Sequence, residues 1–219
     1  PIIHDIKEKL QDGLIGDVVA MHGMFWLYKP DDYFKKDWRK KDGAGPIYIN
    51  LSHDIDLMRY FLGEIESVQA VSSNKTRGFE IEDTSVAILN FASGVVGSIS
   101  ISDTIVSPWS YELTSNENPA YHHTTANCYW IGGTDGSIEL PKGTIWSHKG
   151  NKSWWEPISS TTTVNKKSNP IYNQIDNFIN VIRGKDKPLV SGLEGLKTSA
   201  VIDAIKLSTT TSRSEKPKF

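Results

Sequence analysis

The sequence lacks most of the features that mark secreted, membrane-bound or nucleic-acid-binding proteins. It has one cysteine, Cys128, so no disulfide can form within the chain, which favours a reducing compartment. No apolar run reaches the roughly 20 residues of a membrane-spanning helix, and the first residues do not resemble a signal peptide. The 24 Lys and Arg residues nearly balance the 26 Asp and Glu residues without forming a basic stripe. We therefore expect a cytoplasmic protein that binds neither membrane nor nucleic acid.

Several catalytic signatures are also missing. No G-x-S-x-G motif occurs, and GGTDGS at 132–137 lies between predicted strands, whereas a dinucleotide-binding loop joins a strand to a helix. His122 and His123 are adjacent, and neighbouring histidines rarely reach the same metal ion. We expect neither a metal site nor a nucleotide-binding site within this chain. A metal-dependent sugar isomerase remains an alternative that elemental analysis would detect.

Apolar residues recur at helical spacing in four segments. They are 2–10, 51–62, 171–182 and 193–205. Gly13, Gly63 and Gly184 follow the first three segments closely, as helix-ending glycines do. In the second segment the apolar stripe is formed by residues at positions i, i+4, i+7 and i+11, namely Leu51, Ile55, Met58 and Leu62.

Alternation with a period of two predicts eight strands. They are 16–28, 66–73, 83–91, 94–102, 110–115, 127–133, 137–141 and 144–150. The first is expected to present Val19, Met21, Phe25 and Leu27 on one side. Short turns such as Ser93-Gly94 and Asp135-Gly136 join consecutive strands and indicate antiparallel pairing.

We therefore predict one α+β unit: a large open, mostly antiparallel sheet with helices packed on one face. The serines at 98, 100 and 102 alternate with isoleucines, so the other face is expected to be partly polar. Either water or another subunit must cover that face. The seven tryptophans and eight tyrosines favour self-association.

His53 is the leading candidate for chemistry. It lies early in the helix predicted at 51–62 and off the apolar stripe, where the positive end of the helix dipole would keep an imidazole neutral. Asp56, one turn further on, is expected to orient the ring. Periodicity alone favours the alternative that His53 is only hydrogen-bonded near a helix start. Asn50 is either the N-cap of this helix or a ligand for a substrate hydroxyl.

Two polar and aromatic segments are candidates for substrate binding. In SPWSYELTSNENPAYHH, the aromatic rings of Trp109 and Tyr111 near the carboxylate of Glu117 and the amide of Asn118 suit a sugar, although a rigid turn with sheet aromatics explains the segment equally well. In the loop 29–45, Arg39 would bind a substrate carboxylate or phosphate or would be a solvated charge. Trp38 would line the pocket or anchor the loop in the core.

Six segments, in order and with matching spacing, resemble the C-terminal domain of the glucose-fructose oxidoreductase / inositol dehydrogenase (Gfo/Idh/MocA) family. The resemblance runs from about Pro1 to Ser208, and its most specific part is the run into HDIDLMRY. The segments are GLIGDVVAMHG, DWRKKDGAGPIYINLSHDIDLMRYFLGE, IEDTSVAILNFASGVVGSIS, WSYELTSNENPAY, IGGTDGSIELP and DKPLVSGLEGLKTSAVIDAIKLS.

The resemblance implies a two-domain oxidoreductase. Family members join an N-terminal Rossmann domain, which binds NAD or NADP, to a C-terminal domain that shapes the substrate pocket and often forms dimers or tetramers through its sheet. They oxidise or reduce a hydroxyl-bearing carbon of a sugar, an inositol or a related compound. We accordingly expect residues 1–219 to be the C-terminal substrate-binding and oligomerisation domain, without the dinucleotide-binding domain and inactive alone.

The resemblance also implies roles for individual residues. The family's proton-transferring histidine maps onto His53, which favours the catalytic interpretation, with Asn50 as its partner. The expected substrate-binding residues are Trp38, Arg39, Trp109, Asn118 and Tyr121. Many members have an aspartate four residues before the histidine, where this chain has Ile49. That departure keeps open a non-catalytic module for sugar binding or oligomerisation.

Overall fold

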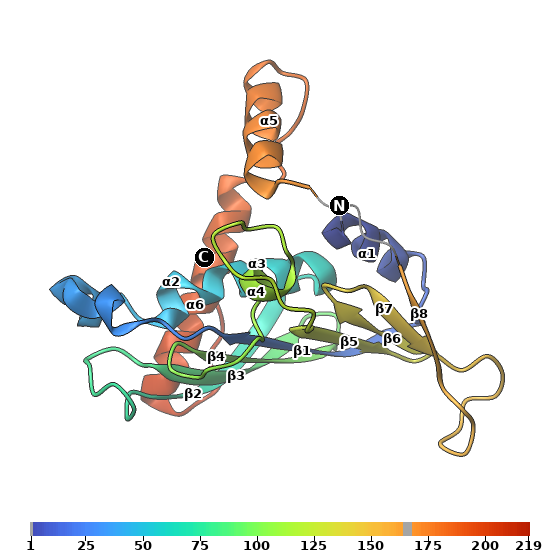
Figure 1. The fold of residues 1–219 in the computed structure, drawn as a ribbon, viewed down its shortest axis with the longest axis horizontal. Helices are drawn as coiled ribbons and strands as arrows, with labels where there is room; N and C mark the ends of the chain where they lie inside the picture. Colours follow the sequence, from blue (N-terminus) through green and yellow to red (C-terminus); the bar gives the residue numbers. More distant parts are fainter. Residues whose placement is uncertain (1, 164–167) are drawn as a thin grey trace.

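The computed structural model describes residues 2–163 and 168–219 and is built around one sheet (Figure 1). The strands are β1 (Val18–Trp26), β2 (Ile65–Ser73), β3 (Thr84–Phe91), β4 (Val96–Ser102), β5 (Tyr129–Gly133), β6 (Gly136–Leu140), β7 (Thr144–Ser147) and β8 (Ser159–Thr162). Their order is β2-β3-β4-β1-β5-β6-β7-β8. β1 and β4 pair in parallel, and the other neighbours pair antiparallel. The predicted mostly antiparallel sheet is confirmed.

Helices cover one face of this sheet, as Figure 1 shows. The α-helices are α1 (Ile2–Gln11), α2 (Pro46–Ile49), α3 (Leu51–Leu62), α4 (Tyr111–Thr114), α5 (Pro170–Ile182) and α6 (Gly192–Thr211). The apolar stripes of α1, α3 and the later part of α6 meet the inward side chains of β1 to β6 in one hydrophobic core. Two short 3-10 helices, η1 (Asp31–Lys35) and η2 (Asp37–Lys40), form an arm beyond the edge of this body.

Figure 1 shows no helix covering the opposite face of the sheet, and this face carries exposed apolar side chains. Val71, Val86, Ile88 and Val96 are 43–68% exposed, and the strand register places Val71 opposite Val86. Serines interrupt this surface as expected, since Ser98 Oγ lies 2.9 Å from Nδ1 of His22. We call the four exposed aliphatic residues the open-face patch. They supply the uncovered face that the sequence predicts.

Three local predictions were wrong. Residues 110–115 do not form a strand, because the Ser110 side chain accepts a hydrogen bond from the Leu113 amide and begins α4. Val19 points outward because the register between β1 and β5 shifts between Val18 and Ala20. Strand β8 was missed, because its Ser and Thr residues show no apolar alternation.

Helix α5 is confirmed as a helix, but its apolar stripe is not packed in the core. No residue of α5 is buried, and its stripe is 53–70% exposed and consists of Ile171, Ile175, Phe178 and Ile182. Figure 1 shows α5 projecting away from the sheet and its other helices. A large apolar surface, which we call the α5 stripe, therefore faces solvent at this end of the molecule.

Among the described residues, no helix combines the length and apolar character needed to cross a membrane.

Candidate functional site

The helical segment that carries His53 starts earlier than predicted. The amide of Asn50 donates to the carbonyl of Pro46 (2.9 Å), and the amide of His53 donates to the carbonyl of Asn50 (3.2 Å), so helical hydrogen bonding runs from α2 into α3. Glu82 accepts from the Ile47 amide (3.0 Å) near the start of α2. His53 is the third residue of α3 and lies in its first turn, as the sequence predicts, where the helix dipole acts. The expected effect of the dipole on His53 stays a prediction.

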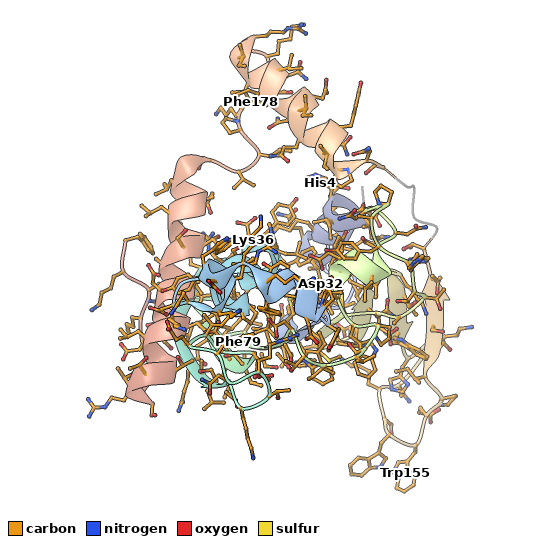
Figure 2. The ribbon with its side chains drawn as sticks, turned by 60° about the vertical axis from the view of Figure 1, so that its left-hand side comes forward. His4, Asp32, Lys36, Phe79, Trp155 and Phe178 are labelled. Atoms are coloured by element: carbon orange, nitrogen blue, oxygen red, sulfur yellow. The ribbon has the colours of Figure 1, made fainter. Side chains whose placement is uncertain are left out.

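A cavity of about 480 Å³ opens beside α3. Its wall combines α1, α3, α4, the start of β5 and the segment between α5 and α6, and Figure 2 shows His4 of α1 beneath α5. The residues that line it are Ile3, His4, His53, Asp54, Asp56, Leu57, Tyr60, Tyr111, Glu112, Ser115, Glu117, Asn118, Tyr129, Pro170, Leu189 and Val190. Of the predicted site residues, His53 and Asn118 belong to this wall.

His53 is exposed in this wall, and among the described residues no side chain hydrogen-bonds its ring. Asp56 does not orient the ring as expected. Its Oδ1 accepts a hydrogen bond from the Thr198 hydroxyl (3.0 Å) and lies 4.0 Å from Nη1 of Arg59. The His53 imidazole is consequently available to a ligand in the cavity.

Asn50 is not among the residues that line the cavity and is held by a buried lysine. It occupies the N-cap position of α3, as predicted, but its side chain does not make the expected cap hydrogen bond. Instead, Oδ1 of Asn50 accepts from Nζ of Lys29 (2.7 Å), which also lies 3.9 Å from Asp103. Burial lowers the pKa of Lys29, and the nearby Asp103 carboxylate opposes this shift. Lys29 had no signal in the sequence, because its partners come from distant segments.

The structure separates Trp38 and Arg39 from the cavity. Trp38 is 55% exposed on the arm and is not an anchor in the core. The Arg39 guanidinium lies 3.9 Å from the centre of the Tyr33 ring and donates to the Tyr33 carbonyl (2.9 Å). Figure 2 shows the arm through its residues Asp32 and Lys36. The contacts of Arg39 thus stabilise the arm, and neither residue lines the cavity.

The other predicted binding residues are divided in the same way. Asn118 lines the cavity, and its Oδ1 accepts from the Ala120 amide (3.0 Å). Trp109 packs against Trp26 with ring centres 5.5 Å apart. Tyr121 is half-exposed and is tied to Asn118 only through its backbone amide (3.3 Å). Trp109 and Tyr121 do not line the cavity.

A buried acid that was not predicted from the sequence follows His53 in α3. Asp54 is 2% exposed, and the hydroxyl of Tyr129 donates a hydrogen bond to its Oδ1. Burial raises the pKa of Asp54 to about 8; the Tyr129 hydrogen bond opposes this, and the Glu112 carboxylate adds to it. A signal was present, since position 54 falls three residues after Leu51 and four before Met58, on the buried stripe.

Two carboxyl oxygens of the cavity wall are unpaired within the described part of the chain. Oδ2 of Asp54 and Oε2 of Glu112 are both buried without a hydrogen-bond partner. Glu117, in contrast, accepts from the Tyr111 hydroxyl (3.1 Å). Burial also raises the pKa of Tyr111, so this hydroxyl keeps its proton. The wall thus contains carboxyl oxygens without a hydrogen-bond partner next to aromatic rings, a combination found in sites for polyhydroxylated ligands.

The described residues do not fit a dinucleotide. β1 and β4 form the one parallel strand pair within residues 2–163 and 168–219, and no glycine-rich turn leads from a strand into a helix there, as a nucleotide-binding unit requires. In this same part of the chain, no group of three or more His, Cys, Asp and Glu residues is placed to hold a metal ion.

Similar proteins of known structure share this fold. The chain is 24% identical to an oxidoreductase from Thermotoga maritima, with a TM-score of 0.74, and the match covers 95% of this chain and 57% of that one. It is 23% identical to the WlbA dehydrogenase from Bordetella pertussis, solved with NADH and UDP-GlcNAcA, with a TM-score of 0.72 over 100% of this chain and 60% of that one.

Sequence comparison agrees with the structural likeness. A levoglucosan dehydrogenase from Pseudarthrobacter phenanthrenivorans is 26% identical over an alignment of 165 residues, and the match covers 63% of this chain and 38% of that protein. The chain therefore spans less than two thirds of the length of these relatives. Residues 3–139 match the profile of the GFO/IDH/MocA C-terminal domain. On the fold, the cavity beside α3 and this match, the chain belongs to the GFO/IDH/MocA C-terminal domain family.

Proposed function

We propose that this chain is the substrate-binding part of an NAD(P)-dependent oxidoreductase that acts on a hydroxyl-bearing carbon of a sugar, an inositol or a related polyol. The observation that carries the proposal is the exposed, unpaired imidazole of His53 in the wall of the 480 Å³ cavity. The names of the levoglucosan dehydrogenase and the WlbA dehydrogenase support the class of reaction. A hydroxyl-rich ligand also suits the carboxylates and tyrosines around His53.

The proposed role of His53 is proton transfer at the reacting hydroxyl. Oxidation of an alcohol removes one hydride from carbon and one proton from oxygen, and a bound nicotinamide supplies the hydride chemistry. An imidazole exchanges protons near neutral pH, so His53 would take the hydroxyl proton during oxidation and return it during reduction. Asn50 would assist through its amide N–H groups, because Lys29 already occupies its carbonyl oxygen.

The cofactor is proposed to bind to a separate dinucleotide-binding domain of the same protein. Two observations support this: the relatives are longer than this chain, and the α5 stripe is exposed beside the cavity. Burying such a stripe against a second domain would remove its apolar surface from water. This second domain would also close the cavity from the side of α5. With Cys128 buried as a free thiol, we keep the cytoplasm as the proposed compartment.

The open-face patch is proposed to bind a second copy of the chain. Its aliphatic side chains lie on the neighbouring strands β2, β3 and β4 and are exposed on the same face of the sheet. A sheet face of this kind can pack on an identical face around a two-fold axis, which closes the assembly as a dimer. A tetramer would require a further contact of the same kind elsewhere on the protein.

The experiment that tests the proposed function is a steady-state assay of the complete oxidoreductase with His53→Ala. We expect kcat to fall by about 10²- to 10⁴-fold, the usual contribution of a general acid or base, with an unchanged melting temperature. His4→Ala is the matched control, because His4 lines the same cavity but its Nδ1 lies 3.0 Å from the Tyr60 hydroxyl. An unchanged kcat in the His53 variant, or loss of folded protein, would refute the catalytic role.

A non-catalytic sugar-binding module is the second candidate. Ile49 stands where many family members have an aspartate, and Lys29 engages the neighbouring Asn50. A complete protein that binds polyols but turns none over with either NAD or NADP would favour this candidate.

A further inference from the structure

The two unpaired carboxyl oxygens of the cavity have no structural function that explains them. A buried polar atom without a partner costs free energy, and folded proteins satisfy nearly all such atoms. The Tyr129 hydroxyl satisfies Oδ1 of Asp54 but leaves Oδ2 unpaired, and Oε2 of Glu112 is unpaired as well. Both residues line the same cavity, so a ligand in that cavity is positioned to complete their hydrogen bonding.

We propose that Asp54 and Glu112 form a subsite that binds hydroxyl or amino groups of the substrate and selects uncharged or amino-bearing polyols over phosphorylated or carboxylated sugars. This inference rests on the proposed function and names the substrate class of that site. Asp54 and Glu112 would act in binding and specificity, next to the proton-transferring His53.

The charges of the wall support this selection. Four carboxyl side chains line the cavity, namely Asp54, Asp56, Glu112 and Glu117, and none of the described lining residues is Lys or Arg. Two cations contact lining residues but are engaged elsewhere. Arg59 lies 4.0 Å from Asp56 and pairs with Glu64 and Glu194, and Lys7 lies over the Tyr60 ring and donates to the Phe61 carbonyl. A phosphate or carboxylate placed here would meet the carboxylates of Asp56, Glu112 and Glu117, which carry charge of its own sign, without a cationic partner in the wall, and this is unfavourable in a partly desolvated site.

The hydrogen-bonding character of the pair matches neighbouring hydroxyl groups. Because burial raises the pKa of Asp54 to about 8, this side chain is mainly protonated at neutral pH. Tyr129 already donates to Oδ1, so the acid proton belongs on the unpaired Oδ2, which becomes a donor. Oε2 of Glu112 is an acceptor. A polyol, whose hydroxyls both donate and accept, is complementary to one donor and one acceptor in the same wall.

Equilibrium binding tests the proposal with the complete oxidoreductase that contains this chain. The probes are myo-inositol, glucosamine, glucose 6-phosphate and glucuronate, titrated at millimolar concentrations with detection by NMR chemical shifts. We expect myo-inositol and glucosamine to bind at least about tenfold more tightly than the two anions, the factor that corresponds to one unfavourable charge contact. Tighter binding of either anion would overturn the proposal, as would the absence of binding by all four probes.

Variants locate the binding to the pair. Asp54→Asn keeps a neutral donor and should change the myo-inositol Kd by less than about threefold, whereas Asp54→Leu and Glu112→Met should each weaken it by about tenfold or more. Glu66→Gln is the control, because Glu66 pairs with Lys216 and does not line the cavity. Melting temperatures identify any variant that fails to fold, and the partly exposed Glu112 provides a second test if Asp54→Leu does so.

Unchanged binding in a folded Glu112→Met protein would overturn the subsite. That outcome is distinct from failure of the proposed function, which the turnover of the His53 variant decides.

Discussion

The hydroxyl of Tyr129 on β5 donates a hydrogen bond to Oδ1 of Asp54 on α3. This contact links the sheet to the helix immediately after His53. Since a helix fixes the relative directions of successive side chains, holding Asp54 against the sheet also determines that His53 points into the cavity. The link between a core tyrosine and a buried acid is thus the structural basis of the proposed site.

Removing the donor of this link should be costly. In Tyr129→Phe the buried Oδ1 of Asp54 loses its partner, and we expect the free energy of unfolding to fall by about 1–3 kcal/mol. Urea denaturation measures the change. Tyr111→Phe is the comparison, because its partner Glu117 is only half-buried and can turn to water. An equal decrease in the free energy of unfolding in the two variants would show that the Tyr129–Asp54 hydrogen bond stabilises the fold no more than the Tyr111–Glu117 hydrogen bond.

The raised pKa of Asp54 predicts how stability depends on pH. Between its ordinary value of 3.8 and its folded value of about 8, the unfolded chain releases the Asp54 proton and the folded chain retains it. Asp54 therefore stabilises the fold fully below the lower value, and this contribution is lost as the pH rises to about 8. Glu112, Cys128 and Tyr129 face Asp54 and contribute to its electrostatic environment.

In Asp54→Asn this pH dependence should disappear. The free energy of unfolding should decline less steeply in the variant, by up to about 1.4 kcal/mol per pH unit between pH 4 and 8. Chemical denaturation at several pH values gives the two slopes. If they coincide, Asp54 titrates normally and the proposed neutral donor is excluded.

A charge in the open-face patch should break the proposed dimer. Ile88 lies on β3 between Gln69 and Ser98 of the neighbouring strands, so Ile88→Lys would bring one lysine from each copy into the interface. We expect light scattering to show a monomer without a change in melting temperature. Val106→Lys changes an equally apolar but more exposed residue outside the strands and should leave the dimer intact. A wild-type monomer would contradict this assembly.

The sequence was sufficient to predict most of the architecture, because its elements have clear periodicity. The stripes of α1 and α3 and the alternation in β3 and β4 come from the same core that buries them. The parallel pairing of β1 with β4 could not be predicted, since register between distant strands depends on contacts that no local pattern encodes. The exposure of the α5 stripe could not be predicted either. An apolar stripe indicates that a helix face is buried, but it does not tell whether the surface that buries it belongs to this chain.

The site could be predicted only in part. His53 was identified by its place off the apolar stripe and by family resemblance, and Asn118 by its polar, aromatic surroundings. Asp54 was recognisable only as an acid on a buried stripe, and its unpaired oxygen required the position of Tyr129, far along the chain. Arg39 was predicted to bind substrate from its charge alone. In the structure it contacts the nearby Tyr33 instead, on an arm away from the cavity.

The most direct test is a titration of histidine-labelled protein with myo-inositol, in which NMR records the ring signals of the six histidines. The account predicts saturable shifts for His53, with smaller shifts for His4 across the cavity, and unchanged signals for His22 and His148 outside it. Unmoved His53 signals at saturating ligand, or shifts confined to histidines outside the cavity, would contradict the claim that this imidazole meets the substrate.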